Sequence, residues 1–282
     1  MNFKAPTRQN RLPSAVVGIG LCVCGMITLA SPLPASAAGE QALREPAPAV
    51  QLQAIEETGR SSGAEPVLDQ NLVQNGGFET GDFSYWTTSG NFLSCSVSSS
   101  SLFVHSGACG AELGPVGALG YLSQTLPTSA GQAYLISLWL YSGGMPPNEF
   151  LVMWDGNSLF DGADLGSTGW INLQFGVVAA GADTVLQIGF RNDPGYFGLD
   201  DISVTPIPAP AFQSVTQSEG KLSFSWNATL GQVYQLQYKT NLAQTNWIDW
   251  GSPMMAGSAV MSASDTIGPD PQRIYRVLIR LR

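Results

Sequence analysis

Charged side chains are scarce in this chain, since lysine, arginine, aspartate and glutamate make up only 12% of its 282 residues. Bases are scarcest in the middle, where residues 71–206 contain eleven carboxylates and a single base, Arg191. Such an acidic segment repels a phosphate backbone, which argues against nucleic acid as a partner. Neutral sugars or a divalent cation suit the segment better.

Histidine occurs once, as His105, between serine- and glycine-rich sequence. A Ser-His-Asp site would need this histidine between a nucleophile and an orienting acid, and the chain has no G-x-S-x-G elbow. We interpret His105 as a solvated loop residue and predict that the protein is not an enzyme. Spacing alone does not exclude a carboxylate pair for glycoside hydrolysis. However, the following aspartates adjoin turn sequence, where a carboxylate serves the backbone: Asp82, Asp155, Asp161 and Asp193.

Long hydrophobic runs are absent after residue 37, so no later segment is expected to span a membrane. Residues 1–37 have the pattern of a secretory signal peptide: an early group of bases, an apolar run, and small residues at the end. Residues 38–70 are rich in Ala, Pro, Glu and Gln and lack aromatic residues, which predicts a flexible leader. The mature protein is therefore expected to be soluble and either secreted or at the cell surface.

Cysteine is also rare, with four residues in the chain. Cys22 and Cys24 fall within the expected signal peptide, so they would leave with it. Cys95 and Cys109 remain, in a serine-rich segment with the pattern of two short strands around a loop. In an exported protein this pair is expected to form a disulfide. The alternative, a metal site, lacks further ligands beyond His105.

The rest of the chain is dominated by strand patterns. Short apolar runs between residues 117 and 205 are separated by turns that contain Gly, Pro and Asp. The runs are LGYLSQTL, AYLISLWLYS, EFLVMWDG, WINLQFGVV, TVLQIGFR and GLDDISVT. The end stretches Asn71–Trp86 and Gly198–Thr205 are expected to meet and close the domain. This spacing, without helical periodicity, predicts an all-β sandwich.

A second β-unit is predicted after the Pro-rich linker 207–211. Within residues 212–282, apolar and polar positions alternate in two runs, KLSFSWN and VYQLQYK, and IYRV is expected to be a closing strand. This unit resembles a small fibronectin type III or immunoglobulin-like module. No Arg-flanked hydrophobic tail follows it.

The first unit resembles a known family. The motifs that carry the resemblance are NGGFETGDFSYW, GAELGPVG, LSQTLPTSAGQAYLISLWL, PNEFLVMWDG and FRNDPGYFGLDDISV. They resemble the carbohydrate-binding modules of the galactose-binding-domain-like fold, in the version found in exported bacterial proteins with a PEP-CTERM tail. The resemblance spans residues 71–206 and implies a jelly-roll β-sandwich. It specifies the fold much more than a ligand, since one fold hosts many functions.

The resemblance also implies a structural calcium ion. Related modules hold one where the first and last strands meet, and the matching positions here are Glu79 and Asp200. Alternation places Asp200 on the same face as Ile202 and Val204, hence toward the interior, where a carboxylate needs a cation or several donors. The alternative, which stays open, is that Asp200 accepts N–H groups from the Gly76-Gly77 turn.

A sugar site usually has an aromatic ring that stacks on the apolar face of a pyranose. In AYLISLWLYS, Leu138 and Leu140 lie on the face expected to enter the core, so Trp139 and Tyr141 lie on the opposite face. An aromatic pair also occurs in the loop after Asp193, beginning at Tyr196. The residues predicted to bind carbohydrate are Trp139, Tyr141 and Tyr196, whereas Trp86 and Trp154 are predicted to be core.

Together these features predict a secreted, non-catalytic carbohydrate-binding protein with a structural calcium ion. Its expected partner is an extracellular glycan or a cell-surface polysaccharide. The alternative is a cell-surface or matrix protein whose domains act as spacers or adhesive units without a glycan site. An exposed aromatic groove favours the first interpretation, and a flat polar surface favours the second.

Overall fold

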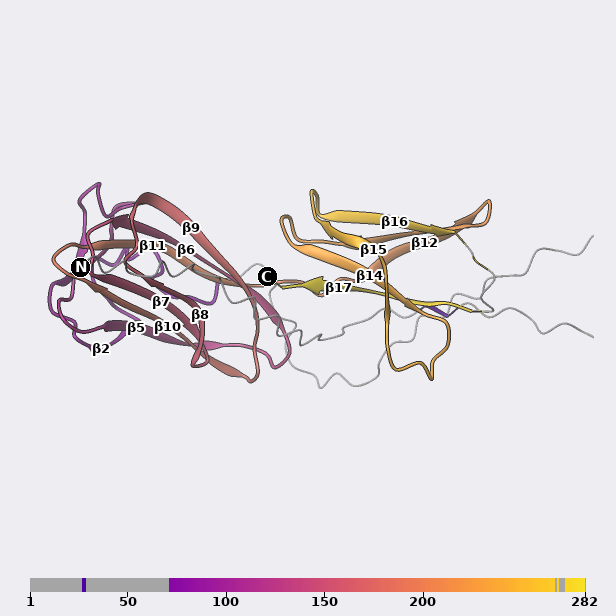
Figure 1. Cartoon of the computed structure of the whole chain (residues 1–282), viewed down its shortest axis with the longest axis horizontal. Coiled ribbons are helices and arrows are strands. Elements are labelled where there is room, and N and C mark those ends of the chain that lie inside the picture. Colours follow the sequence, from indigo (N-terminus) through magenta and orange to yellow (C-terminus); the bar gives the residue numbers. More distant parts are fainter. Residues whose placement is uncertain (1–26, 29–70, 267, 269–271, 282) are drawn as a thin grey trace, which may run out of the picture.

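The computed structural model describes residues 27–28, 71–266, 268 and 272–281. The predicted signal peptide, apart from residues 27–28, and the predicted leader 38–70 lie outside these residues, as do Cys22 and Cys24. The described part contains strands and turns and no helix. It forms two β-sandwiches that lie end to end (Figure 1). The predicted all-β class is confirmed.

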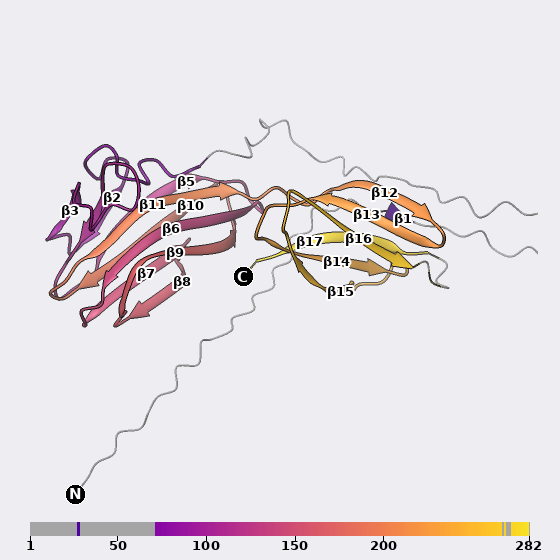
Figure 2. The ribbon, with the colours of Figure 1, turned by 90° about the horizontal axis from the view of Figure 1, so that it is seen from above.

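The first sandwich packs two five-stranded antiparallel sheets face to face (Figure 1), and the two sheets overlap when seen from above (Figure 2). One sheet, in spatial order, consists of β2 (Thr87–Gly90), β5 (Gly120–Pro127), β10 (Asp183–Asn192), β7 (Asn148–Trp154) and β8 (Asn157–Ala163). The other, in spatial order, consists of β3 (Cys95–Ser98), β4 (Gly110–Leu113), β11 (Phe197–Pro206), β6 (Ala133–Gly143) and β9 (Ser167–Val178). We call the second sheet the upper sheet, after its position in Figure 1.

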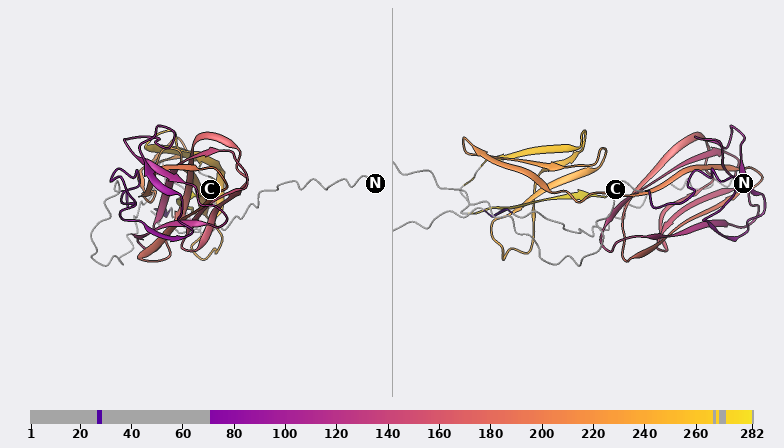
Figure 3. Two further views of the ribbon diagram at one scale, coloured as in Figure 1. Left: turned by 90° about the vertical axis from the view of Figure 1, so that its left-hand side faces the viewer. Right: turned by 180° about the vertical axis from the view of Figure 1, so that it is seen from behind.

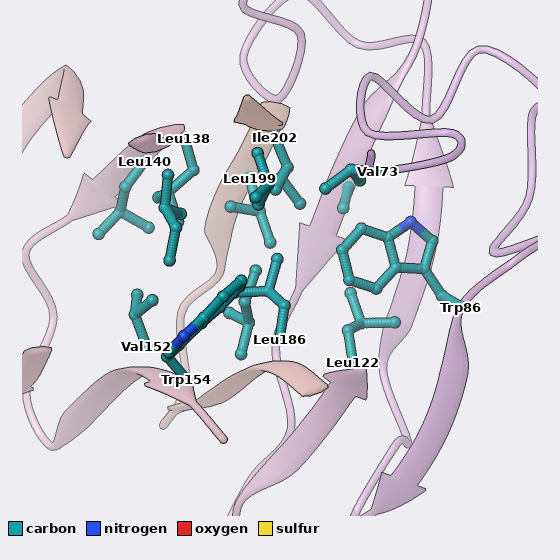
Figure 4. Close-up of a cluster of buried hydrophobic side chains, with 14 of the residues drawn as sticks. Val73, Trp86, Leu122, Leu138, Leu140, Val152, Trp154, Leu186, Leu199 and Ile202 are labelled. Carbon is teal, nitrogen blue, oxygen red and sulfur yellow. The ribbon is translucent and has the colours of Figure 1, made fainter. Parts of the chain in front are cut away.

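Alternation along β6 decides which side chains enter the core. Leu138 and Leu140 are buried, with 0% and 1% of their surface exposed, whereas Trp139 and Tyr141 between them are half-buried on the other face. Figure 4 shows the two leucines in a cluster with side chains of both sheets. As predicted, Trp86 and Trp154 also belong to this core. Burying residues of this size supplies most of the stabilisation of such a sandwich.

The two ends of the sandwich meet as predicted, although residues 71–78 form no regular strand. The amide of Val204 donates to the side-chain oxygen of Asn71 at 2.9 Å, and the amide of Leu72 donates to the Val204 carbonyl at 2.9 Å. The amide of Ile202 donates to the Gly76 carbonyl at 2.9 Å. An asparagine side chain thus supplies part of the edge pairing that a ladder would otherwise provide.

A β-bulge in β11 reverses the orientation predicted for Asp200. Asp200 pairs with Trp139, but the next pair joins Ser203 to Ser137, so β11 contains one extra residue at this point. Asp201 takes up this residue in a left-handed conformation, with φ 50°. The prediction that Asp200 shares the inward face of Ile202 is therefore wrong. Asp200 lies on the outer face of the upper sheet, beside Trp139.

The predicted disulfide is also wrong, because strand register separates the two cysteines. Cys95 pairs with Leu113 at one end of the β3–β4 hairpin, while Cys109 adjoins Gly110, which pairs with Ser98 at the other end. Four residues of strand separate the two positions, which is about 13 Å. A disulfide requires Cα atoms within about 7 Å. Both cysteines are free thiols, and burial raises the pKa of the Cys95 thiol to about 11.

The second sandwich packs a four-stranded sheet on a three-stranded one. The first sheet, in spatial order, consists of β1 (Ile27–Thr28), β17 (Ile274–Arg280), β14 (Val233–Lys239) and β15 (Ile248–Met255). The second, in spatial order, consists of β12 (Phe212–Ser218), β13 (Lys221–Asn227) and β16 (Val260–Thr266). Its core is separate from that of the first sandwich and includes Trp226, Tyr234 and Tyr275.

Residues between the two sandwiches extend the hydrogen bonding of the first one. The amide of Ile207 donates to the Ala133 carbonyl at 2.8 Å, and its side chain is 1% exposed. The far end of the second sandwich's C-terminal strand returns to the junction (Figure 3). There a Cβ on Gly176 of β9 would lie only 2.9 Å from a methyl group of Leu281.

Among the described residues there is no helix with the length and hydropathy needed to cross a membrane.

Candidate functional site

One loop covers part of the outer face of the upper sheet. Residues 99–109, which we call the cover loop, connect β3 to β4 and reach β11 and β6. Four of its eleven residues are serine and Phe103 is its one buried side chain, so apolar burial alone does little to fix its shape. It is held instead by three carboxylates that come from other parts of the chain.

Asp200 is the most buried of these carboxylates, with 0% of its surface exposed. Its Oδ2 accepts the amides of His105 at 2.8 Å and Ser106 at 3.2 Å, and its Oδ1 accepts the amide of Asp201 at 2.7 Å. Burial raises the pKa of the Asp200 carboxyl, and these amide hydrogen bonds act in the opposite direction. The donors are therefore amides of the cover loop and β11, and not amides of the Gly76-Gly77 turn.

Glu79 holds the far end of the cover loop. Its two carboxylate oxygens accept the amide of Ala108 at 3.0 and 3.1 Å, and Oε1 also accepts the amide of Cys109 at 3.2 Å. The neighbouring Gly107 has φ +71°, and a Cβ there would lie 2.1 Å from Glu79 Oε1. Only glycine allows both this backbone conformation and this close approach.

Asp201 fixes the side chains at the tip of the cover loop. Its Oδ2 lies 2.6 Å from Nδ1 of His105, and its Oδ1 accepts the hydroxyl of Ser106 at 2.8 Å. The imidazole of His105 stacks on Trp139, with ring centroids 3.8 Å apart and planes inclined by 16°. The prediction of a solvated histidine is wrong, since only 25% of the His105 side chain is exposed. Because Ser106 points its hydroxyl at Asp201, this arrangement is not that of a serine nucleophile beside a histidine base.

The His105–Trp139 stack belongs to a continuous chain of rings. His105 contacts Trp170 edge-on, and Trp170 contacts Tyr141 with centroids 5.9 Å apart. Phe103 joins Tyr141 to Tyr196, with centroid distances of 6.3 and 6.1 Å. We call these six rings the aromatic cluster; its members are Phe103, His105, Trp139, Tyr141, Trp170 and Tyr196. The three residues predicted to bind carbohydrate are thus brought together, although Trp139 is partly covered by His105.

Sequence reasoning missed three members of the aromatic cluster, Phe103, His105 and Trp170, and of these Trp170 had a clear signal in the sequence. Trp170 pairs with Tyr141 across β9 and β6, on the outer face. Its ring lies against Gly198 of β11, where a Cβ would be 2.9 Å from the indole and 3.1 Å from Cβ of Tyr141. The signal was present in WINLQFG, since Ile171, Leu173 and Phe175 pack against the core and leave Trp170 on the opposite face.

Polar side chains lie next to the aromatic cluster on the outer face of the upper sheet. Asn172 pairs with Trp139, and its amide nitrogen donates to the Ser137 hydroxyl at 2.9 Å. Gln174 follows on the same face and is exposed. At the other end of the aromatic cluster, 39% of the Tyr196 surface is exposed. The outer face therefore combines half-buried aromatic rings with amides and hydroxyls, which is the chemistry of sugar-binding surfaces.

The family resemblance implies that Glu79 and Asp200 bind a calcium ion. Glu79 and Asp200 do lie near each other, since a Cβ on Gly77 would be 3.7 Å from atoms of both. However, the oxygens of both carboxylates already accept amide hydrogen bonds. Within the described residues no group of three or more His, Cys, Asp or Glu side chains is arranged to hold a metal ion. The arrangement fits hydrogen-bonded loop anchors and does not fit a calcium cage.

No protein-family model matches the chain, and no curated protein matches it. Several solved structures are similar to it. The carbohydrate-binding module TmCBM61, solved with β-1,4-galactotriose, is 21% identical with a TM-score of 0.42, over 49% of this chain and 99% of that one. The CBM22-1 xylan-binding domain of Paenibacillus barcinonensis Xyn10C is 15% identical with a TM-score of 0.34, over 46% of this chain and 90% of that one.

An adhesin domain is similar as well. The K1 cleaved adhesin domain of Lys-gingipain from Porphyromonas gingivalis W83 is 15% identical with a TM-score of 0.37, over 46% of this chain and 95% of that one. Each of these likenesses concerns the fold of about half the chain.

Proposed function

We propose that the first sandwich binds a neutral extracellular glycan through the aromatic cluster on the outer face of its upper sheet. The observation that carries the proposal is the chain of six rings outside the core. Most aromatic side chains of a sandwich belong to its interior, whereas Trp139, Tyr141 and Trp170 are half-buried on the opposite face. Aromatic groups gathered on an outer face usually mark a binding surface.

Charge favours a neutral sugar over a charged ligand. The first sandwich has eleven carboxylates and one base. That base, Arg191, already donates to Asp193 at 2.6 Å. A neutral pyranose brings no charge into this field, its C–H face stacks on the rings, and its hydroxyls bond to amides such as Asn172.

The test is a binding measurement with matched variants of the full chain. β-1,4-galactotriose and xylan are suitable first probes, being the sugars named for two similar modules, and a glycan array follows. Trp170→Ala and Tyr141→Ala are expected to abolish binding to the glycan that the wild type selects. Tyr85→Ala is the control, since Tyr85 is an aromatic residue with 65% exposure outside the aromatic cluster.

Two results would overturn the proposal. If the wild-type chain binds no glycan, the alternative of a spacer or adhesion protein gains support. If a glycan binds and both variants in the aromatic cluster retain full affinity, the site lies elsewhere. In either case melting of the variants shows whether the fold itself was kept. The absence of catalysis and the export of the chain stay predictions that this binding measurement does not test.

A further inference from the structure

A cluster of one aromatic and two cationic side chains lies on the second sandwich, on the outer face of the sheet formed by β15, β14 and β17. Trp247, just before β15, has two cations over its ring. The Nζ atom of Lys239 is 4.6 Å from the ring centroid, and the guanidinium carbon of Arg276 is 4.2 Å from it. Such contacts stabilise a cation over the electron-rich face of an indole.

The register explains why these three side chains meet. Arg276 of β17 pairs with Gln237 of β14, and Gln237 pairs with Asp249 of β15. Lys239 is two residues beyond Gln237 and Trp247 is two residues before Asp249, so all of them project from one face. Tyr234, Tyr275 and Val277 enter the core from the other face. We call Lys239, Trp247 and Arg276 the cationic site.

The cationic site keeps positive charge that carboxylates elsewhere on this sandwich do not neutralise. Within the described residues neither Lys239 nor Arg276 makes an ion pair. Asp249 is the carboxylate that the strand register places nearest to these cations on this face. It already forms an ion pair with Arg280 and accepts a hydrogen bond from the amide of Gln237. Arg276 uses its Nε to donate to Gln237 Oε1 at 2.7 Å, which holds the guanidinium in place.

An arginine fixed in this way suits a carboxylate. Its terminal nitrogens can give two parallel hydrogen bonds to the two oxygens of a planar carboxylate, and the ammonium of Lys239 adds a second charge beside them. The indole of Trp247 already holds the side chains of Lys239 and Arg276 in place. Binding of a carboxylate therefore costs less side-chain entropy than it would with two mobile cations. One guanidinium and one ammonium beside the same indole suit a single anionic group.

The distribution of charge indicates what carries that group. Residues 212–282 contain six bases and four acids, whereas residues 71–206 contain eleven acids and one base. A polyanion is repelled by the first sandwich and attracted to the second. Repulsion between exposed charges fades over about 8 Å in physiological salt, so the second sandwich can act independently of the first.

We propose that the cationic site binds the carboxylate groups of an acidic, uronate-containing polysaccharide. The chain would then have two glycan sites of opposite character: the aromatic cluster for a neutral sugar and the cationic site for an acidic one. This second site does not depend on the function proposed for the first sandwich. It gives the C-terminal sandwich a binding role of its own.

The experiment uses the full chain with polygalacturonate, and with the fully methyl-esterified polymer as a ligand control that lacks the charge. Binding to polygalacturonate is expected, with an affinity that falls as salt rises, while the methyl ester is expected to show none. Arg276→Gln is expected to weaken binding at least about tenfold, as is usual for a lost hydrogen bond to a charged group. Lys239→Gln is expected to weaken it by a smaller factor.

Two control variants complete the design. Lys221→Gln removes an exposed lysine from β13, in the other sheet of the same sandwich, and is expected to leave affinity unchanged. Trp170→Ala is also expected to leave it unchanged, which separates this site from the aromatic cluster. If Arg276→Gln does not fold, Lys239→Gln still tests the site, because it replaces an outer-face side chain that makes no ion pair within the described residues.

The proposal is overturned if the wild-type chain does not bind polygalacturonate, or if it binds the methyl-esterified polymer equally well. It is also overturned if Lys221→Gln weakens binding as much as Lys239→Gln does, since general charge would then explain the affinity. Analytical sedimentation of the chain without any glycan tests for self-association. Self-association that Arg276→Gln abolishes would assign the cationic site to the acidic sandwich of a second copy instead.

Discussion

The imidazole ring of His105 lies on the indole ring of Trp139, with centroids 3.8 Å apart. These two residues are far apart in the sequence, and they meet because Asp200 and Asp201 hold the cover loop over β6. The contact joins the cover loop to the aromatic cluster. The state of the loop anchors should therefore affect both the stability of the sandwich and the shape of the candidate site.

Gly107→Ala tests the loop anchors. The new Cβ would overlap Glu79 Oε1, 2.1 Å away, in a conformation with φ +71°. We expect a loss of about 2 kcal/mol or more in the free energy of unfolding, because both strain and a displaced carboxylate contribute. Denaturant unfolding measures this. Gly81→Ala is the matched control, since Gly81 has φ +79° and no atom within 4 Å of its Cβ position, so it should cost only about 1 kcal/mol. Equal losses in the two variants would show that Glu79 does not anchor the loop.

The pH dependence of stability tests the burial of Asp200. Burial raises the pKa of this carboxyl above its ordinary value of 3.8. A raised pKa means that the folded state binds the proton more tightly, so this group favours folding below its ordinary pKa and loses that contribution as pH rises through the raised value. The unfolding free energy of the wild type minus that of Asp200→Asn should therefore fall as pH rises above 3.8. A difference that increases with pH would mean that amide donors outweigh burial.

Chelation distinguishes hydrogen-bonded anchors from a calcium site. In the geometry seen here, amides of residues 105–109 compensate the charges of Glu79 and Asp200. We therefore expect the melting temperature to be the same in EDTA and in excess calcium. If calcium raises the melting temperature, and Asp200→Ala removes the effect, the ion implied by the family resemblance is present. Binding to the native state alone adds about 2.7 kcal/mol at a hundredfold excess over the dissociation constant.

Thiol chemistry tests the cysteine assignment. The structure has Cys95 and Cys109 as free thiols at opposite ends of a hairpin. Alkylation of the unfolded, unreduced protein, followed by peptide mapping, should label both residues. In the folded protein Cys95 should react slowly at neutral pH, because a thiol with a pKa of about 11 is almost wholly protonated. A cross-linked peptide containing both cysteines would contradict this assignment.

Much of the fold could be predicted because alternation is a local property. The burial of Leu138 and Leu140, and the outward position of Trp139 and Tyr141, follow from the side-chain period of a strand. The same rule would have found Trp170. It failed at Asp200, where one residue in a left-handed conformation inserts a bulge and moves every later side chain to the other face.

Contacts between distant segments could not be predicted from such patterns. The spacing of Cys95 and Cys109 is compatible with a disulfide, and only the register of β3 and β4 separates them. The serine and glycine neighbours of His105 predict a solvated side chain, and nothing near it in the sequence indicates a contact with Trp139. Which loop covers which face depends on carboxylates supplied by β11 and by the turn at Glu79.

The most direct test of glycan binding by the aromatic cluster measures binding and melting together for Trp170→Ala and Trp154→Ala. Trp154 is a core residue with 5% exposure, and truncating a core tryptophan costs about 3–5 kcal/mol. Trp170 lies outside the core, so its truncation should cost clearly less stability while abolishing glycan binding. The account is contradicted if Trp170→Ala keeps full affinity for the glycan that the wild type binds, or if it destabilises the protein as much as Trp154→Ala does.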